Sequence, residues 1–234
     1  MTSFVLPVYN CYRELKSILP AFINVVEKTG APYEIIIVDD GSEKKLALDD
    51  CMNEHCKLLV NDKNQGKGYA VKRGMEQATG DEIIFMDGDF PFDLSVVETA
   101  VATLSKPGVD MIIGDRTLAG SSFAEVPFIR AAGSRIISFI VGRFITPGYY
   151  DTQCGIKGFK NAVARGIFSR LTVTGFSFDV EVVFIALQKK YNIEKIPVKV
   201  EKQLSSNVKV VFHGFEMLWN FFRIKIHAAK GGYK

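Results

Sequence analysis

The stretch DEIIFMDGDF at residues 81–90 places an apolar run directly before two carboxylates, Asp87 and Asp89, with one glycine between them. A short run that is apolar at every position is typical of a strand buried on both faces of a sheet. Two like charges this close repel one another, so folding alone gives no reason for the pair. The stretch therefore predicts a buried strand whose end holds a positive group between the two carboxylates.

Strand-like apolar segments alternate with longer segments of helical period along most of the chain. This alternation is typical of βαβ units, so the sequence predicts an α/β fold with a mostly parallel, Rossmann-like sheet flanked by helices. In the first half, the expected strands are 3–8, 34–38, 57–60, 82–86 and 109–113, and the expected helices are 11–28, 44–54, 67–79 and 93–105. The second half adds an expected strand at 155–159, helices at 161–169 and 178–190, an edge strand at 194–201 and a C-terminal helix.

Composition limits the kind of protein this can be. With 234 residues, 47% of them apolar and 24% charged, the chain is expected to form one soluble domain. The net charge of +3 is too small to argue for nucleic acid as a partner, and no stretch has the roughly 18 apolar residues that span a bilayer. The N-terminus lacks a signal-peptide pattern, and Cys51, His55 and Cys56 lack the second ligand pair of a zinc site. These observations predict a cytoplasmic protein with reduced thiols.

A second expected strand, EIIIVDD at residues 34–40, also ends in acids, Asp39 and Asp40. In open α/β sheets ligands bind outside the carboxyl ends of the strands, so these acids should share one rim with Asp87 and Asp89. Three interpretations of the Asp87 and Asp89 pair remain open: a helix cap or turn, a shared proton, or ligands for Mg²⁺ or Mn²⁺. The second acidic strand end favours the metal.

The segment NQGKG at residues 64–68 places glycines and a lysine at the start of an expected helix. Backbone N–H groups at a helix start favour an anion, and Lys67 and Arg73 add positive charge. The spacing is neither that of a P-loop nor that of the Rossmann dinucleotide fingerprint. The alternative interpretation is a glycine-capped loop with solvated lysines.

Four segments together resemble the inverting glycosyltransferases of family 2, which have the GT-A fold: SFVLPVYN (3–10), EIIIVDDGS (34–42), NQGKGYAVKRGM (64–75) and DEIIFMDGD (81–89). Three later segments resemble the polyprenyl-phosphate glycosyltransferases of that family: DTQCGIKGFK (151–160), GFSFDVEVVFIA (175–186) and IEKIPVKVE (193–201). The nearest subgroup is the dolichyl-phosphate β-glucosyltransferases, and the dolichyl-phosphate mannose synthases are more distant. The resemblance implies a single domain with three parts: a nucleotide-sugar half at 1–115, an acceptor-side half at 116–206 and a C-terminal amphipathic helix at 207–234.

The resemblance also implies roles for individual residues. Asp87 and Asp89 would hold the donor diphosphate through Mg²⁺ or Mn²⁺, with Asp89 favoured as the direct ligand. The residues implied for catalysis are Asp89, Arg130, Asp151, Asp179 and Glu181. The residues implied for binding the donor and its phosphates are Pro7, Tyr9, Asn10, Asp39, Asp40, Gly41, Ser42, Lys67, Gly68, Arg73, Asp87, Gly88, Arg116, Ser134 and Gln153.

The implied reaction moves a hexose from a nucleotide diphosphate sugar, with UDP-glucose favoured and GDP-mannose possible, to a polyprenyl or dolichyl phosphate. A phosphate monoester has a second pKa of about 6 and is mostly ionised at neutral pH, so it needs no strong base. Arg130 and Arg135 are candidates to hold this acceptor. The alternative is a soluble family 2 transferase acting on a saccharide, lipid or protein hydroxyl, for which Asp151 or Asp179 would have to serve as the base.

Two further classes remain as alternatives. A sugar-nucleotide pyrophosphorylase has a similar fold, but it would open with a glycine-rich loop where this chain has LPVYNCYREL (6–15). A non-catalytic sugar-nucleotide-binding module would not need the acids Asp151, Asp179 and Glu181.

A lipid acceptor requires contact with a membrane, expected here at its cytoplasmic face. Residues 128–145 and 212–230 combine aromatic and basic side chains, as interfacial helices do. The alternatives are that these aromatics close the core or form a homo-oligomer face. The chain departs from its relatives at Pro91, where mannose synthases often place a glutamine ligand, so a third protein ligand to the metal is not implied. Many glucosyl-type relatives also carry a transmembrane segment, which is not expected here.

Overall fold

The computed structural model describes most of the chain. The segments outside the described residues are 45–47, 49, 122–136, 201–209 and 234, together with the side chains of 210–218. The predicted site residues Arg130, Ser134 and Arg135 therefore lie outside the described residues.

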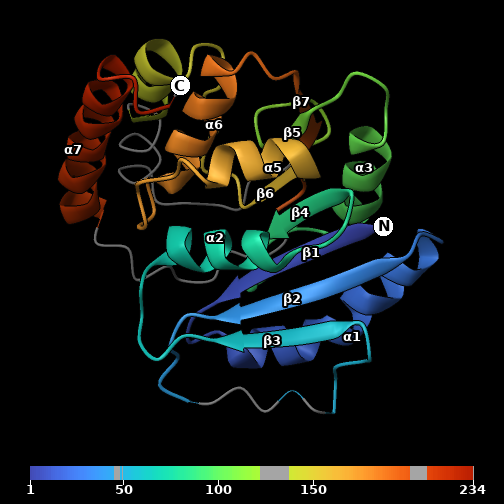
Figure 1. Ribbon diagram of the computed structural model, residues 1–234. Coiled ribbons are helices and arrows are strands. Elements are labelled where there is room, and N and C mark those ends of the chain that lie inside the picture. The colour runs from blue at the N-terminus through green and yellow to red at the C-terminus, as the bar shows by residue number, and fades with distance from the viewer. Residues whose placement is uncertain (45–47, 49, 122–136, 201–209, 234) are drawn as a thin grey trace.

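A seven-stranded sheet forms the centre of the molecule (Figure 1). Its order is β3-β2-β1-β4-β6-β5-β7, and among these strands β6 alone runs antiparallel to its neighbours. The mostly parallel sheet predicted from the sequence is confirmed, and β7, which ends at Pro197, is an edge strand as predicted. The strands are β1 Thr2–Val8, β2 Tyr33–Asp39, β3 Cys56–Val60, β4 Glu82–Met86, β5 Met111–Asp115, β6 Ile156–Lys160 and β7 Ile193–Pro197.

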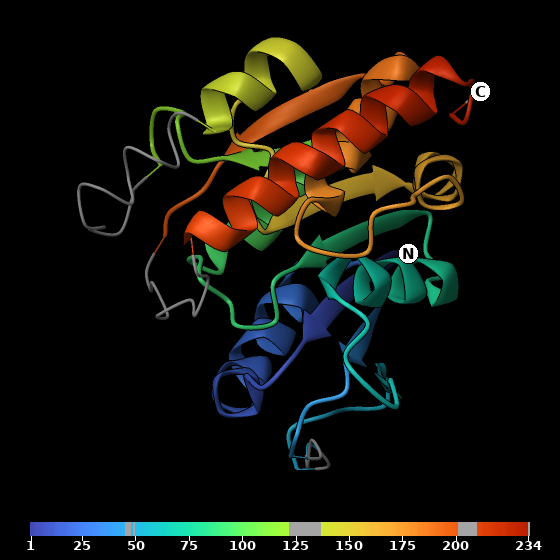
Figure 2. The ribbon, with the colours of Figure 1, turned by 90° about the vertical axis from the view of Figure 1, so that its left-hand side faces the viewer.

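Successive residues of the central strands point to opposite faces of the sheet, and each face is covered by its own helices (Figures 1 and 2). In β1, for example, Val5 packs in one hydrophobic core while Phe4 and Leu6 pack in the other. This two-sided burial explains why the strand sequences are apolar at every position. One face carries α1 Tyr12–Lys28 and α3 Ser95–Leu104, and the other carries α2 Lys67–Gln77, α5 Asn161–Phe168 and α6 Phe178–Gln188.

The C-terminal helix α7, Val210–Ala229, lies on the outer side of α6 (Figures 1 and 2). Phe221 and Ile224 are buried, and the Phe184 ring of α6 lies 5.8 Å from the ring of Tyr233. Residues 137–140 are helical and continue into a π-helix, η1 Val141–Ile145. Among the described residues, no helix combines the length and the apolar character that crossing a bilayer demands.

The helix predicted over 44–54 is not formed by the described residues of that segment, which make turns and irregular backbone. Asn53 gives the physical reason, because its side chain takes over local hydrogen bonding: Oδ1 accepts from the His55 N–H at 3.1 Å and Nδ2 donates to the Tyr33 hydroxyl at 2.8 Å. An asparagine bonded in this way favours a turn over a helix.

The antiparallel strand β6 decides where the second half of the chain meets the first. Its register pairs Ile156 with Met86 and Lys160 with Glu82, so the start of β6 lies beside the end of β4. The loop at 151–155 therefore reaches the carboxyl edge of the parallel strands. At that edge the Asp87 N–H donates to the Gly155 carbonyl at 2.9 Å.

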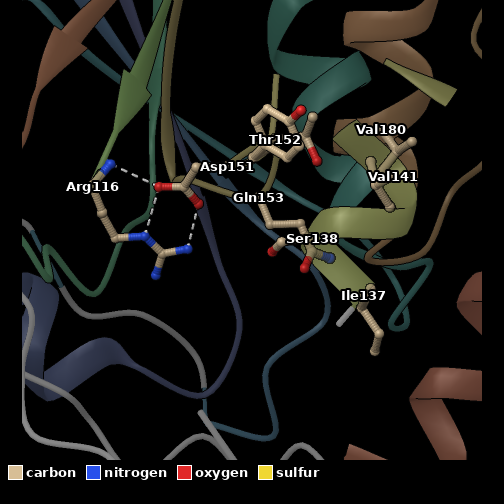
Figure 3. Close-up of a pocket in the computed structure, with 9 residues that line it drawn as sticks. Arg116, Ile137, Ser138, Val141, Asp151, Thr152, Gln153 and Val180 are labelled. Carbon is tan, nitrogen blue, oxygen red and sulfur yellow. Dashed lines mark hydrogen bonds and ion pairs between the residues drawn. The ribbon is translucent and has the colours of Figure 1, made fainter. Parts of the chain in front are cut away.

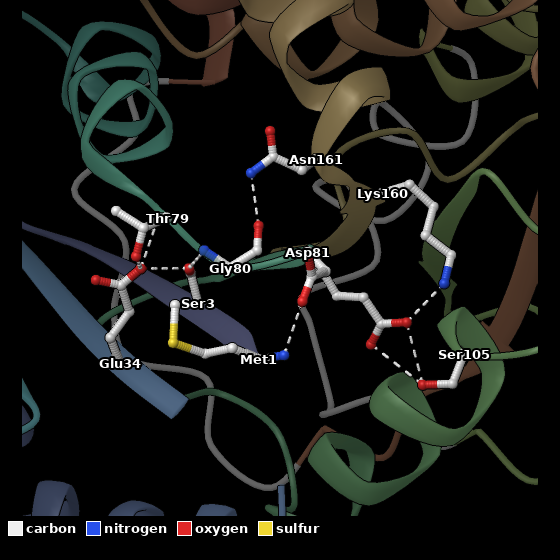
Figure 4. A network of polar contacts seen from close by, with 10 residues as sticks. Met1, Ser3, Glu34, Thr79, Gly80, Asp81, Ser105, Lys160 and Asn161 are labelled. Atoms are coloured by element: carbon white, nitrogen blue, oxygen red, sulfur yellow. Dashed lines mark hydrogen bonds and ion pairs between the residues drawn. The ribbon is translucent and has the colours of Figure 1, made fainter. Parts of the chain in front are cut away.

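At the opposite edge, a polar network ties the strand starts together (Figure 4). Glu34 of β2 accepts hydrogen bonds from Ser3 Oγ at 2.6 Å and from Thr79 N–H and Oγ1 at 2.6 and 2.8 Å. Lys160 of β6 forms an ion pair with Glu82 of β4 at 2.7 Å. These groups satisfy one another, so the amino edge stabilises the strand register and the carboxyl edge remains for ligands.

Candidate active site

A cleft of about 330 Å³ opens at the carboxyl ends of β1 and β4 and beside the start of α2. It brings Asp40, Asp87 and Asp89 to one rim, as expected for strand ends of an open α/β sheet. The cleft is lined by Pro7, Val8, Tyr9, Cys11, Asp40, Asn64, Gly66, Lys67, Ala70, Asp87, Gly88, Asp89 and Phe176.

The glycine between the two carboxylates is required by packing. A Cβ on Gly88 would lie 2.3 Å from Val8 Cγ1 and 2.7 Å from the Pro7 carbonyl oxygen. The chain then turns sharply, because the Phe90 N–H donates to the Asp87 carbonyl at 3.0 Å and Phe90 adopts a φ of 46°. This turn redirects the chain directly after β4, and both carboxylates line the cleft.

The electrostatics of the pair favour a cation. Burial and the neighbouring charge of Asp87 raise the pKa of Asp89 to about 6, and Lys67 offsets only part of this effect. Asp87 Oδ1 is buried and accepts no directed hydrogen bond, although Lys67 Nζ forms an ion pair with it at 2.7 Å. Two hard oxygen donors that lack full neutralisation fit Mg²⁺ or Mn²⁺.

No group of three or more His, Cys, Asp or Glu side chains suited to a metal occurs in the part of the chain that the structure describes. A divalent ion held by Asp87 and Asp89 would therefore take its further ligands from the substrate or from water. Mg²⁺ is commonly held this way, by one or two carboxylates and substrate phosphates. The two-carboxylate arrangement agrees with the proline found at position 91.

Three further charges extend from this pair into the protein. Lys67 Nζ lies 4.0 Å from Asp179 Oδ2, and Asp179 forms a close ion pair with Lys157. Burial opposes the charge of Lys67, but Asp87 and Asp179 outweigh it and raise the pKa of Lys67. Burial raises the pKa of Asp179, and the two lysines act against that rise. Asp179 therefore belongs to the same charge cluster as Lys67 and Asp87.

The acids at the end of β2 organise the loops around the cleft. Asp39 Oδ1 accepts hydrogen bonds from the Ser42 N–H at 3.0 Å and from its hydroxyl at 2.5 Å. Ser42 Oγ in turn accepts from the Asn10 N–H at 2.9 Å. Gly41 adopts a φ of +73°, and a Cβ there would lie 2.4 Å from the backbone of Lys63. These contacts bring together Asn10, Asp39, Gly41 and Ser42, which were expected at the donor base.

The Asp40 carboxylate fixes the glycine-rich turn through hydrogen bonds to its backbone. The carboxylate accepts hydrogen bonds from the backbone N–H groups of Gln65 and Gly66 at 3.0 and 2.8 Å and from Asn61 Nδ2 at 2.7 Å. The anion that these two N–H groups were expected to bind is thus a carboxylate of the protein itself. Asp40 fixes the start of α2 and, with it, the position of Lys67.

Three predicted residues lie away from the carboxylate pair. Arg73 donates to the Val60 carbonyl at 2.8 Å and to Asn61 Oδ1, so it braces the end of β3. Gly68 permits close packing, because a Cβ there would lie 2.7 Å from Phe178 Cβ. Glu181 is fully buried and points away from Asp179, since residues two positions apart in a helix project in nearly opposite directions.

Glu181 is occupied by structural hydrogen bonds. It accepts from the backbone N–H groups of Thr172 and Val173 at 3.0 and 2.7 Å and from the Thr172 hydroxyl at 2.6 Å. The Tyr233 hydroxyl donates to it at 2.5 Å. This carboxylate ties the C-terminal turn after α7 to the loop before α6, so it does not face the cleft.

On the acceptor side, Arg116 and Asp151 form a two-pronged ion pair (Figure 3). Arg116 Nε and Nη2 donate to Asp151 Oδ2 and Oδ1 at 2.9 and 2.6 Å, and the Arg116 backbone N–H donates at 2.8 Å. Although burial opposes the charge, these bonds raise the pKa of Arg116. Gln153 lies across a small pocket from this pair, near Ser138 and Val141 (Figure 3).

Two residues in the cluster were not singled out from the sequence. Lys157 has a side chain with 0% exposure in β6, and Gly155 lies against Asp87 so closely that a Cβ would be 2.1 Å from Asp87 Oδ2. The signal for Lys157 is a charge in the interior of the strand IKGFK, because a charge inside a doubly covered strand needs a buried partner. Gly155 gives no such signal.

A mostly parallel α/β sheet with an acidic carboxyl rim and a cation beside it defines the class of GT-A glycosyltransferases, and the solved structures with similar folds belong to it. The chain is a member of glycosyl transferase family 2, whose model matches residues 3–168. It is 30% identical to a dolichyl-phosphate beta-glucosyltransferase of Drosophila melanogaster, over 99% of this chain and 76% of that protein. Identity to the protein of the same name from Saccharomyces cerevisiae is 29%, with the same coverage.

Solved structures show the same fold at lower sequence identity. Mannosyl-3-phosphoglycerate synthase from Rubrobacter xylanophilus has a TM-score of 0.74 at 15% identity, covering 99% of this chain and 75% of that one. Glucosyl-3-phosphoglycerate synthase from Mycobacterium tuberculosis, in complex with Mn²⁺, UDP and phosphoglyceric acid, has a TM-score of 0.72 at 12% identity. That comparison covers 96% of this chain and 78% of the mycobacterial one.

Proposed function

We propose that this protein transfers glucose from UDP-glucose, with inversion, to the phosphate of a dolichyl or other polyprenyl phosphate. The names of the relatives that match nearly the whole chain support the sugar and the acceptor. The Mn²⁺ and UDP named for the mycobacterial structure support a divalent ion and a uridine donor. GDP-mannose is the competing donor, and a transfer assay distinguishes the two.

The donor half of the cleft has the groups this reaction requires. Pro7 and Tyr9 line it beside the loop held by Asp39, where the nucleoside would lie. Asp87 and Asp89 would hold the divalent ion, which when bound neutralises the charge that develops on the leaving nucleoside diphosphate. Lys67, the first residue of α2, places a protein cation beside the same phosphates.

One observation carries the choice of a phosphate acceptor: both acids that could serve as a general base are engaged. Asp151 is held by Arg116 through both carboxylate oxygens, and Asp179 is buried against Lys157. A hydroxyl acceptor needs a carboxylate that is free to take its proton. A phosphate with a second pKa of about 6 already carries its charge and needs positioning by cations instead. The candidates for that role, Arg130 and Arg135, lie outside the described residues.

Exposed aromatic side chains support contact with a membrane surface. On α7, Trp219, Phe222 and Ile226 are 66%, 65% and 54% exposed, and their spacing places them along one side of the helix. Phe139 and Phe144 are exposed in the other segment expected at the interface. Large aromatics beside lysines and arginines are typical of helices that lie in the headgroup layer. We infer a peripheral position for the enzyme, at the cytoplasmic face where nucleotide sugars are supplied.

The test is a transfer assay with radiolabelled UDP-glucose and Mn²⁺. A polyprenyl phosphate is the acceptor, and the polyprenol of the same length, which lacks only the phosphate, is the matched control. We expect lipid-linked glucose with the phosphate and none with the alcohol. Equal transfer to the alcohol would contradict the phosphate acceptor and favour a hydroxyl-directed transferase. Transfer from GDP-mannose but not from UDP-glucose would correct the donor.

A further inference from the structure

Lys67 occupies an unusual place for a phosphate-binding lysine, because it is already paired with the carboxylates that are to hold the metal. As the first residue of α2, it has its backbone fixed by the loop that Asp40 holds. Its ammonium lies 2.7 Å from Asp87 Oδ1 and 5.8 Å from the centre of the Phe178 ring. The positive group that the repulsion between Asp87 and Asp89 demands is therefore supplied, in the protein alone, by Lys67.

The position of Lys157 explains why the Lys67 ammonium lies closer to Asp87 than to Asp179. The Lys157 ammonium pairs closely with Asp179 and also donates to the Cys154 carbonyl at 3.0 Å. It lies 5.1 Å from the centre of the Phe85 ring and is fully buried, so its position is fixed. Because Lys157 neutralises Asp179, Lys67 remains 4.0 Å from that acid and makes its closer contact with Asp87.

We propose that Lys67 is an internal counter-ion that keeps the Asp87 and Asp89 pair from binding a divalent cation until a diphosphate arrives. In the donor-free protein a metal must bind beside a fixed positive charge that already occupies one of its ligands. A diphosphate offers the ammonium new oxygen partners and offers the metal new ligands. Metal and donor then bind together. This inference rests on the proposed function, since it takes a diphosphate as the natural ligand of the cleft.

The charge of Lys67 should weaken Mn²⁺ binding to the donor-free protein by a measurable factor. The Lys67 side chain is largely buried, so its repulsion of a cation is only weakly screened by salt. Removing the charge should therefore tighten Mn²⁺ binding to the donor-free protein by about tenfold or more. A tenfold change in Kd corresponds to roughly 1.4 kcal/mol of binding free energy. By linkage, UDP and Mn²⁺ should then strengthen each other's binding by a smaller factor than in the wild type.

The experiment measures Mn²⁺ affinity from the electron paramagnetic resonance signal of the free ion, with and without UDP. Mn²⁺ bound by UDP alone is measured separately and subtracted. Lys67→Met should bind Mn²⁺ about tenfold more tightly than the wild type without UDP, and it should bind UDP more weakly. Lys67→Arg keeps the charge and should stay within about twofold of the wild type. Lys72→Met is the matched control on the same helix, where the lysine donates to the Leu171 carbonyl at 3.5 Å; it should leave Mn²⁺ affinity unchanged.

Three outcomes would overturn the inference, and one of them would also remove the metal site of the proposed function. If Lys67→Met binds Mn²⁺ no more tightly than the wild type while both bind it with UDP, the counter-ion role is wrong and the metal site stands. If neither protein binds Mn²⁺ even with UDP, the metal site of the proposed function fails as well. Tightening by Lys67→Arg equal to that of Lys67→Met would also refute a role based on charge. Lys67→Gln, a polar replacement, repeats the test should the methionine variant fold poorly.

Discussion

Replacing Asp89 with asparagine should stabilise the metal-free protein at neutral pH. Folding raises the pKa of Asp89 from its ordinary value of 3.8 to about 6, first by burial and then by repulsion from Asp87. A raised carboxyl pKa means that the folded state binds the proton more tightly than the unfolded state. The cost of the charge is therefore absent below pH 3.8 and fully present above about pH 6.

The magnitude follows from the shift of about two units. At roughly 1.4 kcal/mol per unit, Asp89→Asn removes a cost of up to about 3 kcal/mol at pH 7.5 and about 1 kcal/mol at pH 4.5. These figures are upper limits, because water reaches part of the side chain. Urea denaturation in the presence of EDTA, at both pH values, measures the difference. A variant that is less stable than the wild type at pH 7.5, or a gain that does not change with pH, would refute the reasoning and favour a structural role for Asp89.

Three further predictions concern the supporting structure. Glu181→Gln should lower the free energy of unfolding by about 1–3 kcal/mol per lost hydrogen bond, with UDP affinity unchanged by titration calorimetry; a loss of turnover without a loss of stability would contradict this. Gly155→Ala should push Asp87 aside and weaken binding of Mn²⁺ with UDP by about tenfold or more, whereas unchanged affinity would show that the close contact can relax. Lys157→Met should destabilise the protein by about 3 kcal/mol because it uncovers the charge of Asp179, and adding Asp179→Leu should restore most of that in urea denaturation. Equal losses in the single and double variants would contradict the pairing.

Much of the fold could be predicted from the sequence because burial on both faces of a sheet leaves a clear apolar pattern. The strands ending at Asp39 and Met86 are examples, and both lie where the sequence places them. The absence of a helix in the described residues of 44–54 could not be predicted in the same way, since Asn53 there donates a hydrogen bond to Tyr33, twenty residues away. The antiparallel direction of β6 also depends on pairing across the sheet, which local pattern does not encode.

The candidate site was predicted in part for a similar reason. The acids at strand ends share a rim because parallel strands end at one edge, so topology alone brings Asp40 and Asp87 together. The partners of each charge depend on tertiary contacts, and the sequence does not give them. Glu181 lies two positions from Asp179 in the same motif. Glu181 nevertheless accepts hydrogen bonds from the loop before α6, whereas Asp179 pairs with Lys157. The charge of Lys157 inside a strand is visible in the sequence, but its partner, Asp179, is known only from the structure.

The central claim is that Asp87 and Asp89 hold a divalent ion together with the diphosphate of the donor. Crystals soaked with UDP and Mn²⁺, measured at the manganese absorption edge, test it directly through the anomalous difference map. The account predicts a manganese peak within coordinating distance of both an Asp87 or Asp89 oxygen and the diphosphate. A nucleotide bound in the cleft with no manganese at these carboxylates, or manganese held elsewhere in the protein, would contradict it.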